Sequence, residues 1–125
     1  MFFTLAFTLL VGHCLAQSHP WIPEHKDAGW MKKHEQLLNT TLHHGKDERI
    51  VFIGDSITDG WQWDERSKNI WTKHYTPRHA YNYGISGDQT QHVLWRIENK
   101  EFDGINPKVT VLMIGKSINV LKISF

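Results

Sequence analysis

Three short apolar runs, each followed by a glycine, constrain the fold of this chain more than any other feature. The runs end at Gly54, Gly84 and Gly115, and stretches with helical spacing separate them. Strands that are buried on both faces are continuous apolar runs, and their alternation with helices is typical of an α/β fold with a parallel sheet. We therefore predict an α/β domain with the three glycines along one edge of the sheet, the edge where such folds bind ligands.

The strands are predicted at residues 49–54, 80–84 and 108–115, and the last of these is the most apolar run after residue 16. A strand as apolar as this one requires helices on both faces and a neighbouring strand at each edge. A first helix is predicted over 30–42, with its buried side formed by Trp30, His34, Leu37, Leu38 and Leu42.

Two more helical stretches are predicted. One is weak and covers residues 70–75, where Pro77 follows closely and ends it. The other begins after the second strand, with Asp88 or Thr90 as its cap. Its apolar side should comprise Val93, Leu94 and Ile97.

Composition limits the range of functions. The 125 residues are enough for one domain, and a hydrophobic content of 40% indicates a packed chain rather than a disordered one. The net charge of +1, from 14 basic and 13 acidic residues, gives no indication of nucleic-acid binding. The nine histidines are scattered without metal-ligand spacing, so we expect no metal site and no cofactor.

Residues 1–16 are apolar but short for a membrane span, and Cys14 and Ala16 occupy the small-residue positions of a cleavage site before Gln17. We predict a signal peptide that is cleaved after Ala16, a secreted chain and no membrane span after cleavage; an uncleaved anchor is the alternative. Residues 17–28 should form an extended lead-in. Asn39 begins the sequon Asn-Thr-Thr and is a candidate for glycosylation in a eukaryotic secretory route.

Ser56 is the candidate nucleophile because it lies at the carboxyl end of a buried strand, although a serine at such a position more often only caps the next helix. Two motif templates fail around these strand ends. A lipase-type Gly-x-Ser-x-Gly turn requires a second glycine where Thr58 stands. A phosphate-binding loop ending at Gly115 requires a glycine where Thr110 stands.

A third template fits. The triplet Gly54-Asp55-Ser56 and the block Asn82–Asp88, about thirty residues further on, together resemble the first two sequence blocks of the SGNH (GDSL) hydrolases. The flanking residues resemble the branch that contains the platelet-activating-factor acetylhydrolase Ib catalytic subunits. The resemblance extends over 29–115 and implies a flavodoxin-like, three-layer α/β/α fold with the third strand beside the first.

The resemblance also implies roles for individual residues. Ser56 would attack an ester carbonyl, and the backbone N–H groups of Ser56 and Gly87 would bind the oxyanion. Asp55 would shape the turn rather than serve as the catalytic acid. The substrate would be a small ester, such as an acetyl ester of a lipid or a sugar. The family does not use the position of His92, so we expect a packing or surface histidine there.

The resemblance fails at the third block, which reads Gly-Thr-Asn-Asn in the family and Gly115-Lys116-Ser117-Ile118 here. Ser117 is aligned with the oxyanion asparagine, and losing such a donor lowers turnover about a hundred- to a thousand-fold. The family's Asp-x-x-His motif occurs nowhere in the sequence, so the catalytic histidine and acid have no counterpart. We therefore expect 29–115 to be the amino-terminal part of a family domain whose carboxyl-terminal part is missing.

Residues 116–125 read as a tail foreign to the family. The codons of Gly115-Lys116-Ser117 can contain GTAAGT, the usual start of a eukaryotic intron, so we hypothesise that the tail is translated intron; genomic sequence without a third block downstream would contradict this. A missing fourth strand would leave the apolar edge of the third strand open. Three functions remain open: a poorly active truncated esterase, a secreted binding module without activity, and an unstable fragment. The oligomeric state is open as well.

Overall fold

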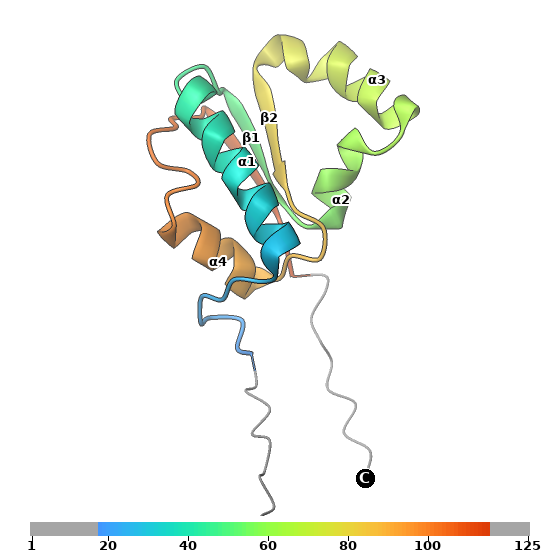
Figure 1. The fold of residues 1–125 in the computed structure, drawn as a ribbon. Helices are drawn as coiled ribbons and strands as arrows, with labels where there is room; N and C mark the ends of the chain where they lie inside the picture. Colours follow the sequence, from blue (N-terminus) through green and yellow to red (C-terminus); the bar gives the residue numbers. More distant parts are fainter. Residues whose placement is uncertain (1–17, 116–125) are drawn as a thin grey trace, which may run out of the picture.

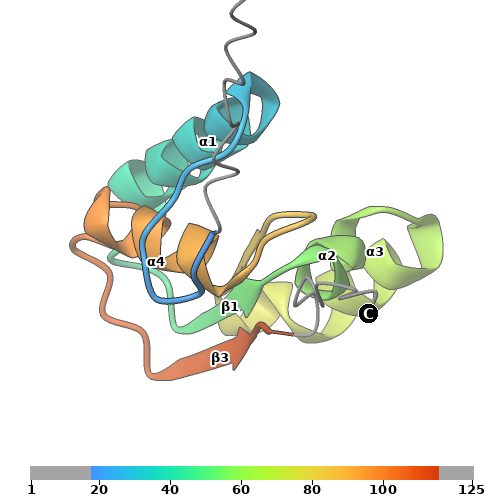
Figure 2. The ribbon, with the colours of Figure 1, turned by 90° about the horizontal axis from the view of Figure 1, so that it is seen from below.

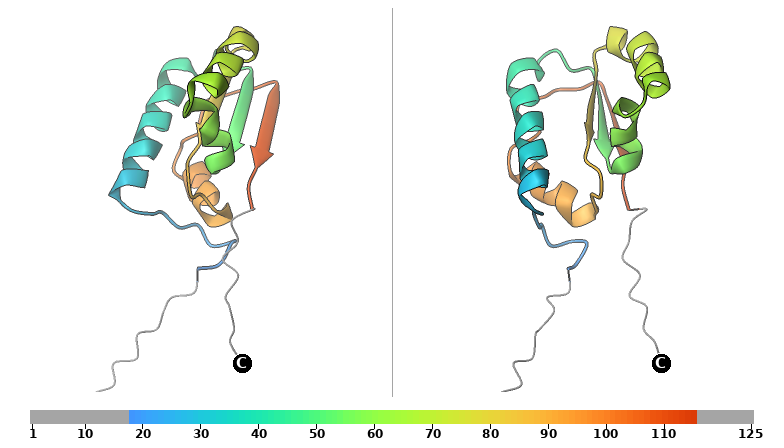
Figure 3. Two further views of the ribbon diagram at one scale, coloured as in Figure 1. Left: turned by 90° about the vertical axis from the view of Figure 1, so that its right-hand side faces the viewer. Right: turned by 45° about the vertical axis from the view of Figure 1, so that its right-hand side comes forward.

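The computed structural model describes residues 18–115, which form three layers around a small parallel sheet (Figures 1 and 3). The strands are β1 (Ile50–Gly54), β2 (Ala80–Gly84) and β3 (Val109–Met113), in the order β2-β1-β3. The helical segments are α1 (Ala28–His44), α2 (Ser56–Asp59), η1 (Gly60–Gln62), α3 (Glu65–His74), η2 (Thr76–Arg78) and α4 (Thr90–Glu98). Helices α1 and α4 lie on one face of the sheet, and α2 and α3 lie on the other.

Both neighbours of β1 run parallel to it, with Gly54 paired to Gly84 on one side and to Met113 on the other. The carboxyl ends of the three strands therefore meet at one edge. This arrangement confirms the predicted α/β class, the parallel sheet and the position of the third strand beside the first. The third strand ends at Met113, two residues before Gly115.

Helix α1 begins at Ala28, earlier than predicted, because the Asp27 carboxylate accepts a hydrogen bond from the Trp30 N–H at 3.0 Å and caps the helix. The prediction that Leu42 faces the core is wrong, since its side chain is 73% exposed. Thr41 is buried instead, and its hydroxyl lies 2.7 Å from the Tyr83 hydroxyl. The buried side of α1 consists of Trp30, His34, Leu37 and Thr41.

The prediction for α4 needs two corrections. Its cap is Gln89, whose backbone N–H donates to His92 Nδ1 at 2.9 Å in a capping box, and neither Asp88 nor Thr90 takes that role. Ile97, predicted to be buried, is 50% exposed. The buried side is largely polar and comprises Gln91, His92, Val93 and Arg96.

The hydrophobic core lies between the sheet and the layer of α1 and α4. It consists of Trp30, Leu37, Val51, Ile53, Tyr83, Ile85 and Val93. An aromatic cluster covers the opposite face: the Phe52 ring packs edge-on against Trp71 and Tyr75, and Trp61 lies beside these two rings. Each layer of helices thus has its own contact with β1.

Strand β3 is the least covered part of the sheet: its outer edge is unpaired within residues 18–115, as expected, and its two faces are exposed although so apolar a strand normally has helices on both. All five of its residues are exposed, with Val109 at 51% and Leu112 at 59%. Figure 2 shows β3 at the margin of the molecule, beyond the helices. Within residues 18–115 no strand pairs with its outer edge, so the backbone groups of that edge are unpaired as well.

The predicted signal peptide, residue Ser117 and the tail 116–125 lie outside the described residues. Among residues 18–115, no helix is both long and apolar enough to cross a bilayer.

Candidate active site

Ser56 lies at the junction between β1 and α2, as the first residue of the helix. The preceding Asp55 is 2% exposed, and its carboxylate accepts a hydrogen bond from the Ile57 N–H at 2.9 Å. Asp55 is therefore the residue that caps α2, and Ser56 is not needed as a cap. In the described part of the chain, the Ser56 hydroxyl has no hydrogen-bond partner of its own and is half-buried.

Two glycines allow α2 to lie directly against the ends of the strands. A Cβ atom on Gly54 would lie 2.3 Å from Thr58 Oγ1 and 2.4 Å from the Met113 carbonyl oxygen. A Cβ atom on Gly84 would lie 2.2 Å from the Asp59 backbone nitrogen. Neither position has room for a side chain, so the motif glycines determine how closely the helix that carries Ser56 approaches the sheet.

The loop after β2 contains Gly87 and is joined to the same edge. The Ile85 N–H donates to the Gly54 carbonyl at 3.0 Å, across the ends of β2 and β1. The Ser86 hydroxyl donates to the Asp59 carboxylate at 2.6 Å, which connects the loop to α2. Gly87 has a φ of +78°, a conformation that L-residues with side chains rarely adopt. Ser56 and Gly87 therefore follow neighbouring strands, and both belong to segments that are joined by hydrogen bonds.

Lys26 also reaches this loop, which the sequence does not predict. Its ammonium group donates to the Gly87 carbonyl at 3.1 Å, and a Cβ atom on Gly87 would lie 2.8 Å from that nitrogen. The Glu24 N–H donates to the Gln91 carbonyl at 3.2 Å nearby. The lead-in thus contacts both the Gly87 loop and α4, and it places a positive charge at the loop.

A buried ionic network lies next to the Gly87 loop and holds Asp88, the residue after Gly87. Arg96 is fully buried and donates to the Asp88 carboxylate at 2.7 Å, to the Tyr83 carbonyl at 2.6 Å and, through Nε, to the Glu101 carboxylate at 2.8 Å. The Trp30 indole donates to the other Asp88 oxygen at 2.6 Å. Burial raises the pKa of Asp88, while the charge of Arg96 and the Trp30 hydrogen bond oppose that shift.

None of the described histidines accepts a hydrogen bond from Ser56. His34 is bound to Glu101 in the buried network, and His92 serves the α4 cap. Burial lowers the pKa of His92, with a smaller contribution from the charge of Lys26. His92 is 8% exposed and packs beside Trp30, as expected for a packing histidine. Residues 18–115 also contain no group of three or more metal-ligating side chains arranged to hold an ion.

The other predicted residues lie away from this edge or beyond it. Asn39 is exposed on α1, with its carbonyl 2.8 Å from His43 Nδ1. Its side chain is therefore accessible from solvent. Ser117, aligned with the oxyanion asparagine, lies outside the described residues.

Comparison with known proteins bears on this arrangement. Residues 52–116 match the GDSL-like lipase/acylhydrolase family. Over 89 residues, the chain is 42% identical to the platelet-activating factor acetylhydrolase IB subunit alpha1 of Homo sapiens and of Rattus norvegicus. It is 39% identical to subunit alpha2 of Homo sapiens over the same length. These alignments cover 71% of this chain but only 36% of each relative, so the chain spans little more than a third of their length.

Proposed function

Because the chain belongs to the GDSL-like lipase/acylhydrolase family, we propose that residues 29–115 form the amino-terminal part of a serine ester hydrolase domain. One observation carries the proposal: Ser56 begins α2 directly after β1, while Asp55 takes over the capping of that helix. The serine hydroxyl is therefore left available for chemistry. The proposed substrate is a small carboxylic ester, with acetyl esters first because the relatives are named as acetylhydrolases.

In the proposed reaction the Ser56 oxygen attacks the ester carbonyl carbon and gives its proton to a base. The negative charge that develops on the carbonyl oxygen is bound by the N–H groups of Ser56 and Gly87, an electrostatic contribution that is usually the largest in acyl transfer. The alcohol then leaves with a proton, and water releases the acid from the acyl-serine. Asp59 and Lys26 act indirectly, because they hold the Gly87 loop in place.

The 125 residues lack the base that this reaction requires. They contain no Asp-x-x-His motif, and a serine hydroxyl without a base is a weak nucleophile at neutral pH. We infer that these residues on their own hydrolyse esters poorly. This inference favours a second candidate function, a secreted binding module that keeps the fold without the reaction.

A chimeric protein separates the two functions. Residues 17–115 are joined to the region of human subunit alpha1 that follows its matching segment, and p-nitrophenyl acetate hydrolysis is measured. We expect clear activity in the chimera and a loss of at least about a thousandfold on Ser56→Ala. Ser18→Ala, an exposed serine in the lead-in, is the control and should leave the rate unchanged. Equal rates for Ser56→Ala and the unmodified chimera would exclude Ser56 as the nucleophile.

We further propose that the chain enters a secretory route, with cleavage after Ala16 and a glycan on Asn39. The exposure of Asn39 on α1 supports the second part. Expression in a eukaryotic secretory system should give a product that begins at Gln17 and loses mass on treatment with an N-glycosidase. Asn39→Gln should abolish the mass loss. An intact Met1 in the product would contradict the cleavage.

A further inference from the structure

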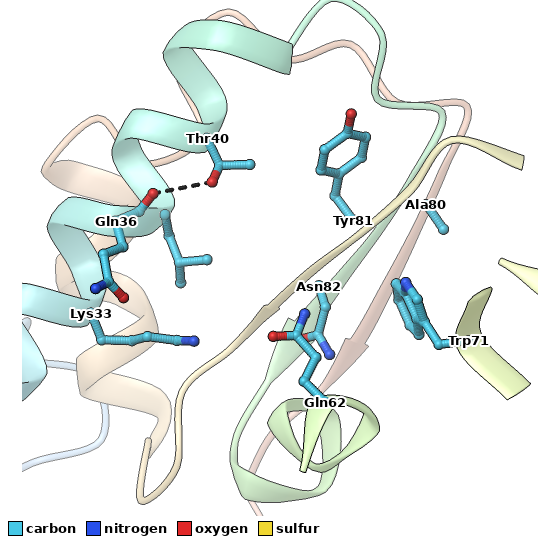
Figure 4. A pocket seen from close by; sticks show the side chains of 9 residues that line it. Lys33, Gln36, Thr40, Gln62, Trp71, Ala80, Tyr81 and Asn82 are labelled. Carbon is cyan, nitrogen blue, oxygen red and sulfur yellow. Dashed lines mark hydrogen bonds between the residues drawn. The ribbon is translucent and has the colours of Figure 1, made fainter. Parts of the chain in front are cut away.

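A pocket of about 340 Å³ lies at the outer edge of β2, between α1 on one side and η1 and α3 on the other (Figure 4). Its volume is at the lower end of the roughly 300–1,000 Å³ that small-molecule sites occupy. The pocket flanks β2, whereas Ser56 follows the end of β1. The walls include Lys33 and Gln36 from α1, Gln62 from η1 and Trp71 from α3, with Tyr81 and Asn82 from β2.

The pocket offers hydrogen-bonding groups that the described part of the protein does not use. The side-chain amides of Gln36 and Gln62 have no partner among residues 18–115, and each supplies two donors and an acceptor. Lys33 is the one charged residue of the lining, and its ammonium lies 3.8 Å from the Asp59 carboxylate, too far for a strong hydrogen bond. Figure 4 shows the side chains of Lys33 and Gln62 approaching the same space.

An added peptide strand does not suit this position, although β2 is an edge strand of the sheet. The Ala80 N–H already donates to the Tyr75 carbonyl at 3.2 Å. The Gly84 N–H donates to the Asn82 side-chain oxygen at 2.8 Å. With these two backbone donors occupied, strand addition would have to break existing hydrogen bonds, which favours a ligand that binds through the side chains.

We propose that this pocket binds a polyhydroxylated ligand of monosaccharide size that carries one carboxylate, that is, an acidic sugar. The amides of Gln36 and Gln62 can each donate to and accept from neighbouring hydroxyl groups. The rings of Trp71 and Tyr81 provide apolar surface for the C–H faces of a sugar ring. Lys33 would pair with the ligand's carboxylate in place of its long ion pair to Asp59, since the lining itself has no acidic residue. The site does not depend on the esterase proposed above.

Titration of the 125-residue chain with sodium glucuronate, glucose and sodium acetate tests the proposal, with Trp fluorescence and amide chemical shifts as readouts. We expect saturable binding of glucuronate, weaker binding of glucose, and no saturation by acetate. Gln62→Ala should weaken the binding of both sugars about tenfold. Lys33→Gln should lower the affinity for glucuronate to that for glucose, with an unchanged melting temperature.

Lys32→Gln, an exposed neighbour outside the pocket, is the matched control and should change neither affinity. The proposal is overturned if glucuronate shows no saturation up to about 50 mM, because a dissociation constant above that concentration is too weak for a specific sugar site. An equal effect of Lys32→Gln and Lys33→Gln would overturn it as well, because it would reveal general charge attraction rather than a pocket. Binding that is insensitive to Gln62→Ala would have the same consequence.

Discussion

Glu48 is a buried acid whose carboxylate is only partly hydrogen-bonded. Its side chain is 2% exposed, and one carboxylate oxygen accepts a hydrogen bond from the Tyr83 hydroxyl at 2.6 Å. The other oxygen has no partner in the described part of the chain. Burial raises the pKa of Glu48, and the Tyr83 hydrogen bond and the nearby His44 only partly offset the rise. The ionised form of Glu48 therefore destabilises the fold at neutral pH.

Replacing this acid should increase stability at neutral pH. The folded state holds the Glu48 proton more tightly than the unfolded state, so the contribution of this group is most favourable at low pH and is lost as pH rises through the folded-state pKa. We expect Glu48→Gln to raise the melting temperature at pH 7 by several degrees, on the order of 1 kcal/mol, and to have less effect near pH 4. Thermal melts across pH measure this. Glu35→Gln, exposed on α1, is the control; an equal gain there would refute the burial argument.

Arg96, by contrast with Glu48, is a buried charge that has several hydrogen-bond partners. Its guanidinium pairs with both buried carboxylates, Asp88 and Glu101. Arg96→Met should therefore lower the free energy of unfolding by about 3–5 kcal/mol, the usual effect of removing one partner of a buried ion pair. Urea unfolding measures the loss. Arg66→Met, exposed on α3, should cost little, and similar losses in both variants would contradict the role of the network.

These polar contacts explain where predictions for single residues fail. Trp30 and Asp88 are 58 positions apart in the sequence, and His34 and Glu101 are 67 apart. Helical spacing identifies α1 and α4 as helices, but it ranks their faces by apolar content. The buried side of α4 carries Arg96 instead of Ile97 because two buried carboxylates, Asp88 before the helix and Glu101 after it, compensate the charge of Arg96. Helical spacing alone does not reveal this pairing, because both carboxylates lie outside the helix.

At the scale of the elements, the contact of α2 with the strand ends leaves the least room for added side-chain atoms. A methyl group at Gly84 would lie 2.2 Å from the Asp59 nitrogen, and backbone cannot move aside as a side chain can. Gly84→Ala should therefore destabilise the protein by about 1–3 kcal/mol or more through overpacking. Gly60→Ala is a suitable control, because the nearest atom to its Cβ would be 3.8 Å away. Chemical denaturation compares the two, and equal stability would show that α2 is free to shift.

The order of the strands and of the main helices could be predicted from the sequence because each strand is a short, mostly apolar run that ends near a glycine. The positions of Ser56 and Gly87 after β1 and β2 follow from the same motifs. The contacts of the Gly87 loop do not follow, since Lys26 and Asp59 reach it from segments without a recognisable pattern. The open outer edge of β3 was expected from the sequence, whereas the exposure of its two faces was not, because burial of a strand depends on which helices cover it.

At the scale of the whole molecule, β3 presents an apolar surface that a soluble domain normally covers. Val109, Val111, Leu112 and Met113 are 39–59% exposed, on both sides of one strand. Exposed apolar edge strands promote association with other chains. We therefore expect the folded chain to self-associate through β3.

A polar substitution in this strand should reduce association without weakening the fold. We expect Leu112→Thr, a residue suited to strands, to lower light scattering at high protein concentration and to change stability by less than about 0.5 kcal/mol. Ile97→Thr is a matched control, since Ile97 is 50% exposed on α4 and far from the sheet edge in sequence. Analytical ultracentrifugation gives the association state. An equal reduction in both variants would assign association to general surface hydrophobicity instead.

The two edge strands of the sheet, β2 and β3, differ in how many of their outward-facing backbone donors are already hydrogen-bonded. At β2, Tyr75 and Asn82 already occupy the Ala80 and Gly84 backbone donors. At β3, within residues 18–115, no strand or side chain performs the same task. A strand that enlarges this sheet, whether it comes from the same polypeptide or from another copy, would break these two hydrogen bonds at β2 and none of that kind at β3. The three-stranded sheet is therefore extended more readily at β3 than at β2.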